Sequence, residues 1–191
     1  MIDQLLQYDT ELFILLNNLG STTWDGLWLV ITDKLTFIPL YAVLLFLLYK
    51  HYGLKSMLIF VVVIALMITF TDQITNVFKR GFMRSRPCGV DELEEQIRFI
   101  AVRCGKYGFF SGHSSNSMAA AVLTGLLLKP YYKNLIFVLL FWSAVVAYSR
   151  IYVGVHYPID ILCGMTFGAM SGFMFYKIAK YALKRFLPAE I

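Results

Sequence analysis

A run of apolar residues at positions 57–70, interrupted only by Thr69, dominates the hydropathy pattern of this chain. It lies within a longer apolar segment, residues 54–78, which is long enough for a helix to cross the hydrocarbon core of a bilayer. Hydrophobic residues make up 59% of the 191 residues and charged residues only 15%, which excludes an ordinary soluble domain. The sequence therefore predicts an all-α, polytopic integral membrane protein built as a helical bundle.

Further apolar segments predict four more membrane helices, at residues 24–49, 113–128, 134–149 and 158–182. The first of these is interrupted by Asp33 and Lys34, and we interpret it as one helix whose first turns lie among the lipid headgroups. Residues 1–20 have apolar residues at helical spacing, three acids and no base, which indicates an interfacial amphipathic helix. We expect five spans and one interfacial helix, with six spans as the alternative, in a single domain over residues 1–191.

The basic residues are divided unevenly between the two ends of the predicted bundle. Helix parity places eight of them at one end: Lys50, Lys55, Lys129, Lys133, Lys177, Lys180, Lys184 and Arg185. The positive-inside rule makes that end cytoplasmic, so the polar loop at residues 82–109 is extracytoplasmic. Because the bases are scattered among apolar stretches, we expect no nucleic-acid partner despite the net charge of +5.

Polar residues occur at helix ends that the same parity places in one layer, at the outward membrane face. Lys79, Arg86 and Arg150 would bring three cations together there, and arginine offers a planar fork that matches phosphate oxygens. Ser111 and Gly112 begin a helix, whose free backbone N–H groups and dipole favour a bound anion. These residues predict a phosphate-binding pocket at the membrane surface.

Two histidines and an aspartate in the same layer would supply the chemistry. His156 and Asp160 are four positions apart, so the carboxylate can reach back and fix the tautomer of the imidazole. The other ring nitrogen of His156 is then free to attack phosphorus. His113, on the opposite side of the anion, would protonate the leaving oxygen. This set needs no metal, and we expect no cofactor.

The spacing of these residues resembles that of a known family. Lys79, Arg86 and Pro87 fit the motif KxxxxxxRP, and residues 111–113 fit most of the motif PSGH. Residues 149–160 fit SRxxxxxHxxxD, and the three motifs occur in this order along the chain. The chain is therefore similar to the type 2 phosphatidic acid phosphatase superfamily.

The resemblance implies a metal-independent phosphatase that passes through a phosphohistidine on His156, with Asp160 orienting it and His113 acting as the acid. By the same resemblance, five residues would hold the phosphoryl group: Lys79, Arg86, Ser111, Gly112 and Arg150. The sequence departs from the family pattern at Phe110, where proline is usual. Because this change removes no catalytic group, we expect activity to be retained.

Two features of the predicted spans concern helix packing. Asp72 lies two helical turns before Lys79 on the same helix face, and we expect it to support a neighbouring helix or a cation rather than to catalyse. Gly164, Gly168 and Gly172 form a stripe of small residues that lets another helix approach closely. We expect that packing to occur within the chain rather than in a dimer.

Two of the three cysteines, Cys88 and Cys104, lie in the outward loop, whereas Cys163 lies inside a span. In an oxidising periplasm Cys88 and Cys104 would form a disulfide, and two free thiols are the alternative. No ligands at metal-binding spacing accompany these cysteines, so we expect no zinc site.

The position of the pocket indicates a lipid phosphate as substrate, in a bacterial cytoplasmic (inner) membrane with the site facing the periplasm or exterior. Lipid A, phosphatidylglycerophosphate and undecaprenyl diphosphate are all consistent with the resemblance. We favour undecaprenyl diphosphate, because four more bases are available for a second phosphate: Arg80, Arg84, Arg103 and Lys106. A transporter would need several polar spans, and a non-catalytic lipid-binding protein would not need an intact catalytic set. The sequence leaves the oligomeric state open.

Overall fold

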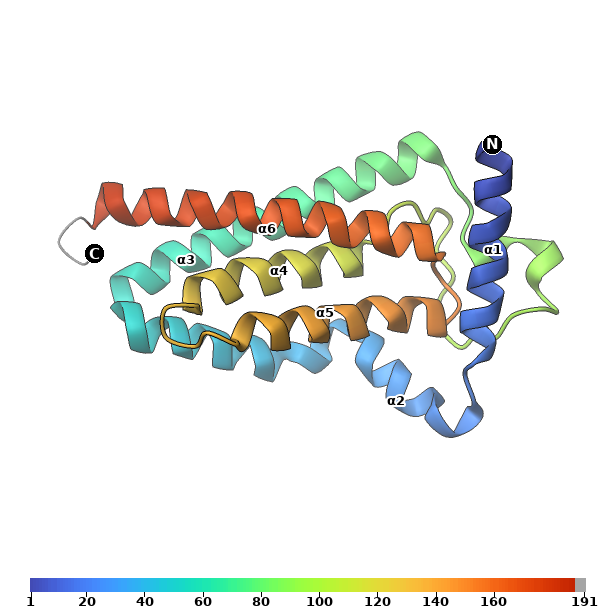
Figure 1. Cartoon of the computed structure of the whole chain (residues 1–191), viewed down its shortest axis with the longest axis horizontal. Coiled ribbons are helices and arrows are strands. Elements are labelled where there is room, and N and C mark those ends of the chain that lie inside the picture. Colours follow the sequence, from blue (N-terminus) through green and yellow to red (C-terminus); the bar gives the residue numbers. More distant parts are fainter. Residues whose placement is uncertain (188–191) are drawn as a thin grey trace.

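The computed structural model describes residues 1–187, and this part of the chain is all-α. Six α-helices follow one another: α1 (Ile2–Asn18), α2 (Thr22–Thr32), α3 (Ile38–Phe82), α4 (Gly112–Leu128), α5 (Leu135–Tyr152) and α6 (Pro158–Phe186). Three short 3-10 turns lie between them: η1 (Lys34–Phe37), η2 (Pro87–Gly89) and η3 (Asp91–Leu93). In Figure 1, α3 to α6 form an elongated bundle and α1 crosses one end of it. The prediction of an all-α bundle is confirmed.

α3 consists of two arms that meet at Gly53. This residue has φ 76° and ψ 174°, a non-helical conformation that glycine adopts without a steric penalty. The chain reverses there, so that the arm after Gly53 runs back along the bundle (Figure 1). The arms, residues 38–52 and 54–82, therefore form two helices, as the sequence predicts on either side of this turn.

The apolar segment at residues 24–49 is not one helix, and this prediction was wrong. α2 ends at Thr32, and the side chain of Asp33 accepts a hydrogen bond at 2.9 Å from the N–H of Leu35, at the beginning of η1. The interruption that we assigned to the headgroup region therefore separates two helices, and the side chain of Asp33 caps the start of the second segment. It brings Thr32 and Lys34 to the end of the bundle that carries the polar motifs.

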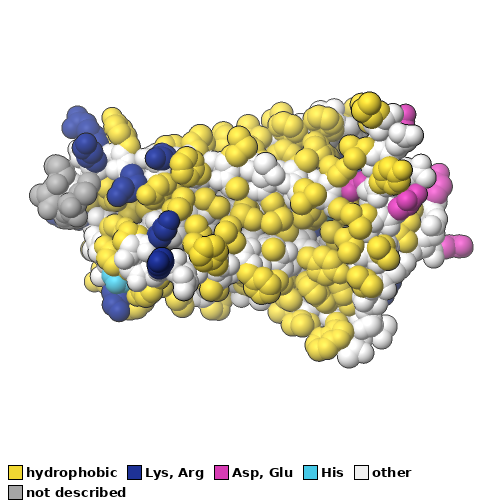
Figure 2. Space-filling view, in the orientation of Figure 1, with side chains coloured by type: hydrophobic (Ala, Val, Ile, Leu, Met, Phe, Trp, Pro, Cys, Tyr) yellow, Lys and Arg dark blue, Asp and Glu magenta, His cyan; other side chains and the backbone are white. Residues whose placement is uncertain are grey.

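Three stretches within residues 1–187 are long and apolar enough to cross a membrane: Lys34–Phe82, Leu135–Tyr152 and Pro158–Phe186. The first of them contains the reversal at Gly53. Figure 2 shows apolar side chains along the middle of the molecule, with Lys and Arg gathered at the end near the C-terminus and acidic side chains at the opposite end. The chain is a multi-pass membrane protein.

α4 is the central helix of the bundle and packs closely against α6. A Cβ atom at Gly164 would lie 2.7 Å from the carbonyl oxygen of Ser111, and one at Gly172 would lie 2.6 Å from that of Ala119. Backbones this close leave no room for a side chain on α6. The glycine stripe therefore serves packing within the chain, as predicted.

α1 lies across the end of the bundle where the polar motifs meet (Figure 1). Asn17 is fully buried there, and its Nδ2 atom donates hydrogen bonds of 3.0 Å to the carbonyls of Arg98, Ile151 and Tyr152. Its Oδ1 atom accepts the N–H of Arg98 at 2.7 Å. α1 is thus fixed to the bundle by buried polar contacts, which its amphipathic pattern did not predict.

A disulfide joins Cys88 and Cys104 in the loop between α3 and α4, with their Cα atoms 5.9 Å apart. The bond closes a loop with a sequence separation of 16. Cys163 in α6 is a free cysteine. The disulfide therefore constrains the segment that follows Arg86 and leads back to α4.

Reduction of this disulfide should lower the free energy of unfolding by about 3 kcal/mol, because the open loop gives the unfolded chain more conformations. The measurement is the midpoint of thermal unfolding in detergent with and without reductant. A Cys88→Ser/Cys104→Ser double variant is the control, since its midpoint should match that of reduced wild type and ignore reductant. Alkylation of both loop thiols in unreduced protein would contradict the bond.

Candidate active site

A cavity of about 700 Å³ lies between the two arms of α3, α4 and α5. Six of the predicted site residues line it: Lys79, Arg86, Gly112, His113, Arg150 and His156. The other two, Ser111 and Asp160, are fully buried beside them. Residues from four separate parts of the chain therefore meet at one end of the bundle, as helix parity predicts.

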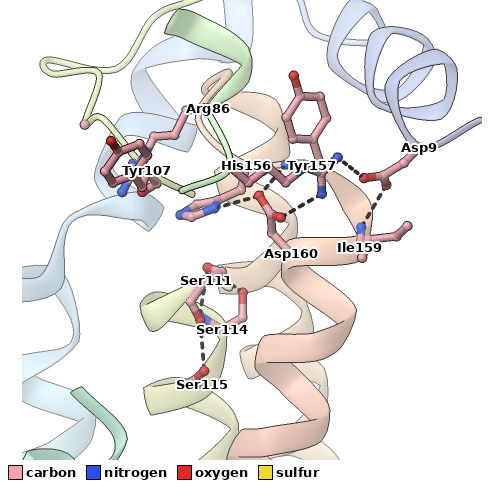
Figure 3. A network of polar contacts seen from close by, with 12 residues as sticks. Asp9, Arg86, Tyr107, Ser111, Ser114, Ser115, His156, Tyr157, Ile159 and Asp160 are labelled. Carbon is pink, nitrogen blue, oxygen red and sulfur yellow. Dashed lines mark hydrogen bonds and ion pairs between the residues drawn. The ribbon is translucent and has the colours of Figure 1, made fainter. Parts of the chain in front are cut away.

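His156 and Asp160 form a pair at the start of α6 (Figure 3). His156 Nδ1 lies 3.3 Å from Asp160 Oδ2, which also accepts the N–H of Tyr157 at 3.2 Å. This pair follows from the local sequence. Tyr157 is the N-cap of α6 and Pro158 is its first residue, so the carboxylate of Asp160, the third residue, reaches back to the cap. With its Nδ1–H donated to Asp160, His156 keeps the Nε2 lone pair free for attack.

The surroundings of His156 keep its imidazole neutral. The residue lies in the turn between α5 and α6 and is 1% exposed. Burial and the positive charges of Arg86 and Arg150 hold the pKa of His156 well below its ordinary value. At neutral pH the imidazole is therefore uncharged, which is the form that can act as a nucleophile.

The two arginines that line the cavity are oriented by contacts with neighbouring segments. Arg86 Nε donates to the carbonyl of Tyr107 at 3.1 Å, and Arg150 Nη1 donates to Thr32 Oγ1. Within residues 1–187, the buried Nε atom of Arg150 has no hydrogen-bond partner. A buried donor of this kind is destabilising unless it meets an acceptor, which fits a role in holding a phosphoryl oxygen.

The N-terminus of α4 adds a second attraction for anions. Ser111 is the N-cap, and its Oγ atom accepts hydrogen bonds from Ser114 N at 3.4 Å and from Ser114 Oγ at 3.0 Å. A Cβ atom at Gly112 would lie 3.8 Å from Lys79 Nζ, so the ammonium group stands beside the first helical turn. Ser111, which we expect to help hold the phosphoryl group, is fully buried and its hydroxyl takes part in the cap.

Phe110, which replaces the usual proline before Ser111, is 4% exposed. Its ring centroid lies 5.1 Å from that of Phe78 on α3 and 5.1 Å from that of Phe167 on α6. Aromatic packing therefore fixes the backbone before α4, where the family pattern uses the ring of proline.

Arg84 binds two carboxylates of the protein, although we expected it to be available for a second phosphate. Its Nη1 atom donates to Asp160 Oδ1 at 2.9 Å and its Nη2 atom donates to Asp9 Oδ2 at 2.6 Å. The prediction that Arg84 is available for a second phosphate was therefore wrong. No local pattern in the sequence indicates this contact, because Asp9 is 75 positions away. The cavity lining within residues 1–187 also does not include the other three bases proposed for that phosphate: Arg80, Arg103 and Lys106.

Three further charged residues line the cavity: Asp33, Lys34 and Asp72. Lys34 comes from η1 and adds a cation at a position where we predicted only the interruption of a helix. Asp72 accepts a hydrogen bond from Asn116 Nδ2 at 2.8 Å, which links α3 to α4. The expectation that Asp72 bonds to a neighbouring helix is confirmed.

The sequence pattern of the PAP2 superfamily matches residues 56–184, well over half of the chain. The chain belongs to the PAP2 superfamily. Over 182 residues it is 36% identical to a lipid A 4'-phosphatase of Bacteroides thetaiotaomicron, which covers 94% of this chain and 80% of that protein. A lipid A 4'-phosphatase of Porphyromonas gingivalis is 32% identical over 99% of this chain and 80% of its own length. An undecaprenyl-diphosphatase of Sulfolobus acidocaldarius is 27% identical over 92% of this chain and 81% of its own length.

Two crystal structures share the fold of this chain. Aquifex aeolicus LpxE matches with a TM-score of 0.68 at 22% identity, over 88% of this chain and 94% of that one. The second structure is that of the first transmembrane PAP2 type phosphatidylglycerolphosphate phosphatase from Bacillus subtilis. It matches with a TM-score of 0.74 at 20% identity, over 96% of this chain and 89% of that one. The resemblance inferred from the motifs is confirmed, and the protein is a PAP2 membrane lipid phosphatase.

Proposed function

We propose that this protein is a lipid A phosphatase that removes a phosphate monoester through a phosphohistidine on His156. The relatives of 36% and 32% identity, both lipid A 4'-phosphatases, support this substrate better than undecaprenyl diphosphate, which we favoured from the sequence. The undecaprenyl-diphosphatase is more distant, at 27% identity. The observation that carries the chemistry is the His156–Asp160 pair, since His156 lines one cavity together with four cations and His113.

In the first step, the Nε2 lone pair of His156 attacks phosphorus while the bond from phosphorus to the leaving oxygen breaks. Asp160 stabilises the positive charge that develops on the imidazole. His113 gives its proton to the leaving oxygen, so the lipid departs as a neutral alcohol. The cations that line the cavity neutralise the phosphoryl oxygens, which carry most of the charge in the transition state.

In the second step, neutral His113 takes a proton from water, and the water oxygen attacks the phosphorus of the phosphohistidine. The P–N bond breaks, inorganic phosphate leaves, and His156 returns to its neutral form. A bound phosphoryl dianion favours the protonated form of His113. His113 therefore becomes an acid when the substrate is in place.

The cavity continues from the polar site into the apolar interior of the bundle, which suits a lipid. The apolar part of its wall includes residues of both arms of α3 and of α4: Leu44, Leu48, Met67, Ile68 and Leu123. A lipid would place its phosphate beside His156 and an acyl chain along these residues. A path for a hydrophilic solute would need polar side chains there, so this lining argues against a transporter.

We further infer five membrane crossings, formed by the two arms of α3 and by α4, α5 and α6, in one domain. The basic end of the molecule in Figure 2 would face the cytoplasm. The site and the disulfide would then face the periplasm or exterior of a bacterial inner membrane, where a disulfide persists.

The test is a phosphate-release panel with the full chain in detergent and EDTA. We expect turnover of bisphosphorylated lipid A and of lipid A that carries only the 4'-phosphate, identified by mass spectrometry of the lipid. The value of kcat/KM for undecaprenyl diphosphate and phosphatidylglycerophosphate should be lower by about 10-fold or more. Preference for undecaprenyl diphosphate would overturn the substrate, and activity that requires Mg²⁺ after chelation would overturn the metal-independent mechanism.

A further inference from the structure

The carboxylate of Asp160 is connected to the N-terminal helix through one arginine. Asp160 Oδ1 accepts a hydrogen bond from Arg84 Nη1 at 2.9 Å, and Arg84 Nη2 donates to Asp9 Oδ2 at 2.6 Å. The side chains of Asp160 and Asp9 are 0% and 1% exposed, and that of Arg84 is 19% exposed. Charged groups from α1, from the segment after α3 and from α6 therefore form a largely buried chain that ends at His156.

Both oxygen atoms of Asp160 have partners, and this fixes the plane of the carboxylate. Oδ2 lies 3.3 Å from His156 Nδ1 and accepts the N–H of Tyr157 at 3.2 Å (Figure 3). Oδ1 is left for Arg84. If Arg84 were removed, the carboxylate could turn about its last torsion and change its angle to the imidazole. The orientation of the pair therefore depends on Arg84.

Arg84 is itself held by α1 and by the turn before α6. Asp9 Oδ2 accepts a hydrogen bond from the guanidinium of Arg84. Its Oδ1 atom accepts the N–H of Ile159 at 2.9 Å (Figure 3). The guanidinium also lies over the ring of Tyr157, 4.1 Å from the centroid. One side chain of α1 thus fixes both the arginine and the first turn of the helix that carries Asp160.

We propose that Asp9 and Arg84 are positioning residues for phosphoryl transfer, which keep Asp160 ionised and directed at His156. The proposal rests on the proposed role of His156 as nucleophile. Within residues 1–187, the lining of the cavity includes neither Asp9 nor Arg84, so both act through Asp160. Through Asp9, α1 would then contribute to catalysis, although α1 lies outside the segment that matches the PAP2 pattern, residues 56–184.

The charge of Arg84 contributes as well as its geometry. An adjacent cation favours the ionised form of Asp160, which accepts the imidazole N–H. The cations that act on His156 from the surrounding segments are Arg86, Arg150, Lys79 and Arg84, and the carboxylate of Asp160 lies 3.3 Å from its Nδ1 atom. Burial lowers the pKa of His156 most and these cations lower it further, so a neutral residue at position 84 should raise this pKa. Because only the neutral imidazole attacks, the acid limb of the rate profile should move to higher pH.

A second arginine at the same end of the molecule provides a matched control. Arg98 Nη2 pairs with Asp25 at 2.7 Å, and its guanidinium lies over the ring of Tyr152, 5.6 Å from the centroid. This ion pair also joins an N-terminal helix to the loop after α3, but its described contacts do not include Asp160. Arg98→Gln therefore removes a similar structural contact without touching the proposed network.

The experiment measures kcat, KM and the pH profile of the full chain with lipid A and with p-nitrophenyl phosphate. Arg84→Gln should lower kcat by about 10- to 100-fold, the range typical of groups that orient a reacting residue, with little change in KM. Its acid limb should move to higher pH, whereas Arg98→Gln should keep the wild-type kcat and profile. Arg84→Lys retains the charge but not the planar fork, so it should keep the wild-type acid limb and recover part of kcat.

A second pair of variants tests the anchor on α1. Asp9→Asn should lower kcat at nearly constant KM, because the amide places a donor against the guanidinium of Arg84. Asp25→Asn, which alters the pair with Arg98, should leave kcat unchanged. If size-exclusion chromatography shows that Arg84→Gln is not folded, the positioning role is tested by Arg84→Lys and by the comparison of Asp9→Asn with Asp25→Asn. Wild-type kcat and pH profile in Arg84→Gln, or equal kcat in Asp9→Asn and Asp25→Asn, would overturn the proposal.

His156→Ala separates this inference from the proposed function. Activity in that variant would refute the assignment of the nucleophile. An inactive His156→Ala together with unaltered Arg84→Gln would instead refute only the positioning network. Because p-nitrophenyl phosphate serves as a second substrate, failure of lipid A as substrate would leave the test of Asp9 and Arg84 intact.

Discussion

Replacement of His156 by alanine should abolish phosphate release, with a loss of about 10⁴-fold or more in kcat, the scale seen when a nucleophile is removed from a hydrolase. The variant lacks the nitrogen that would form the bond to phosphorus. Arg86 and Arg150 remain in the cavity, so binding of the phosphate group should suffer much less than turnover. The measurement is release of inorganic phosphate from lipid A and from p-nitrophenyl phosphate.

His51 provides the matched control for this variant. It lies at the opposite end of the bundle from the site, with its ring stacked on that of Tyr131 at a centroid distance of 3.9 Å and its Nε2 atom 3.0 Å from Tyr132 Oη. His51→Ala also removes an imidazole from the fold but leaves the cavity unaltered, so it should retain wild-type kcat. Comparable kcat values in His156→Ala and His51→Ala would contradict the assignment of the nucleophile.

Replacement of His113 by alanine should lower kcat by about 10²- to 10⁴-fold on lipid A and much less on p-nitrophenyl phosphate. The oxygen that leaves a lipid is strongly basic and needs a proton, whereas p-nitrophenolate departs without one. His113 lines the cavity from the first turn of α4, and we propose that it gives that proton. The measurement is kcat of the variant on both substrates.

The comparison between leaving groups distinguishes an acid from a residue that only supports the site. His156→Ala should be equally inactive on both substrates, because each needs the nucleophile. His113→Ala should recover selectively on the activated ester. An equal loss on both substrates in His113→Ala would contradict its role as the general acid.

The membrane helices could be predicted because hydropathy is a property of local sequence. The apolar run at residues 57–70 lies within the second arm of α3, and the turn at Gly53 falls between two apolar segments. The break at Asp33 was missed, because residues 24–49 are apolar on both sides of it and a side-chain cap leaves little trace in hydropathy. The role of α1 was missed for a related reason, since Asn17 bonds to carbonyls distant in sequence.

The centre of the site could be predicted because its residues occupy fixed positions at helix ends. His156 and Asp160 are one helical turn apart, and parity alone places Arg150 in the same layer as His113. The supporting contacts could not be predicted, because they join residues far apart in sequence. Arg84 and Asp9 are 75 positions apart, and Arg150 and Thr32 are 118 positions apart.

The most direct test of the account is to trap the phosphorylated enzyme. A single turnover of substrate with a radiolabelled phosphate, stopped in alkali, should leave label on wild-type protein that is stable in alkali and lost in acid, as expected for an N–P bond. Peptide mapping should place that label on His156, and His156→Ala should carry none. Absence of label from wild type at every quench time, or equal labelling of His156→Ala, would contradict a phosphohistidine intermediate.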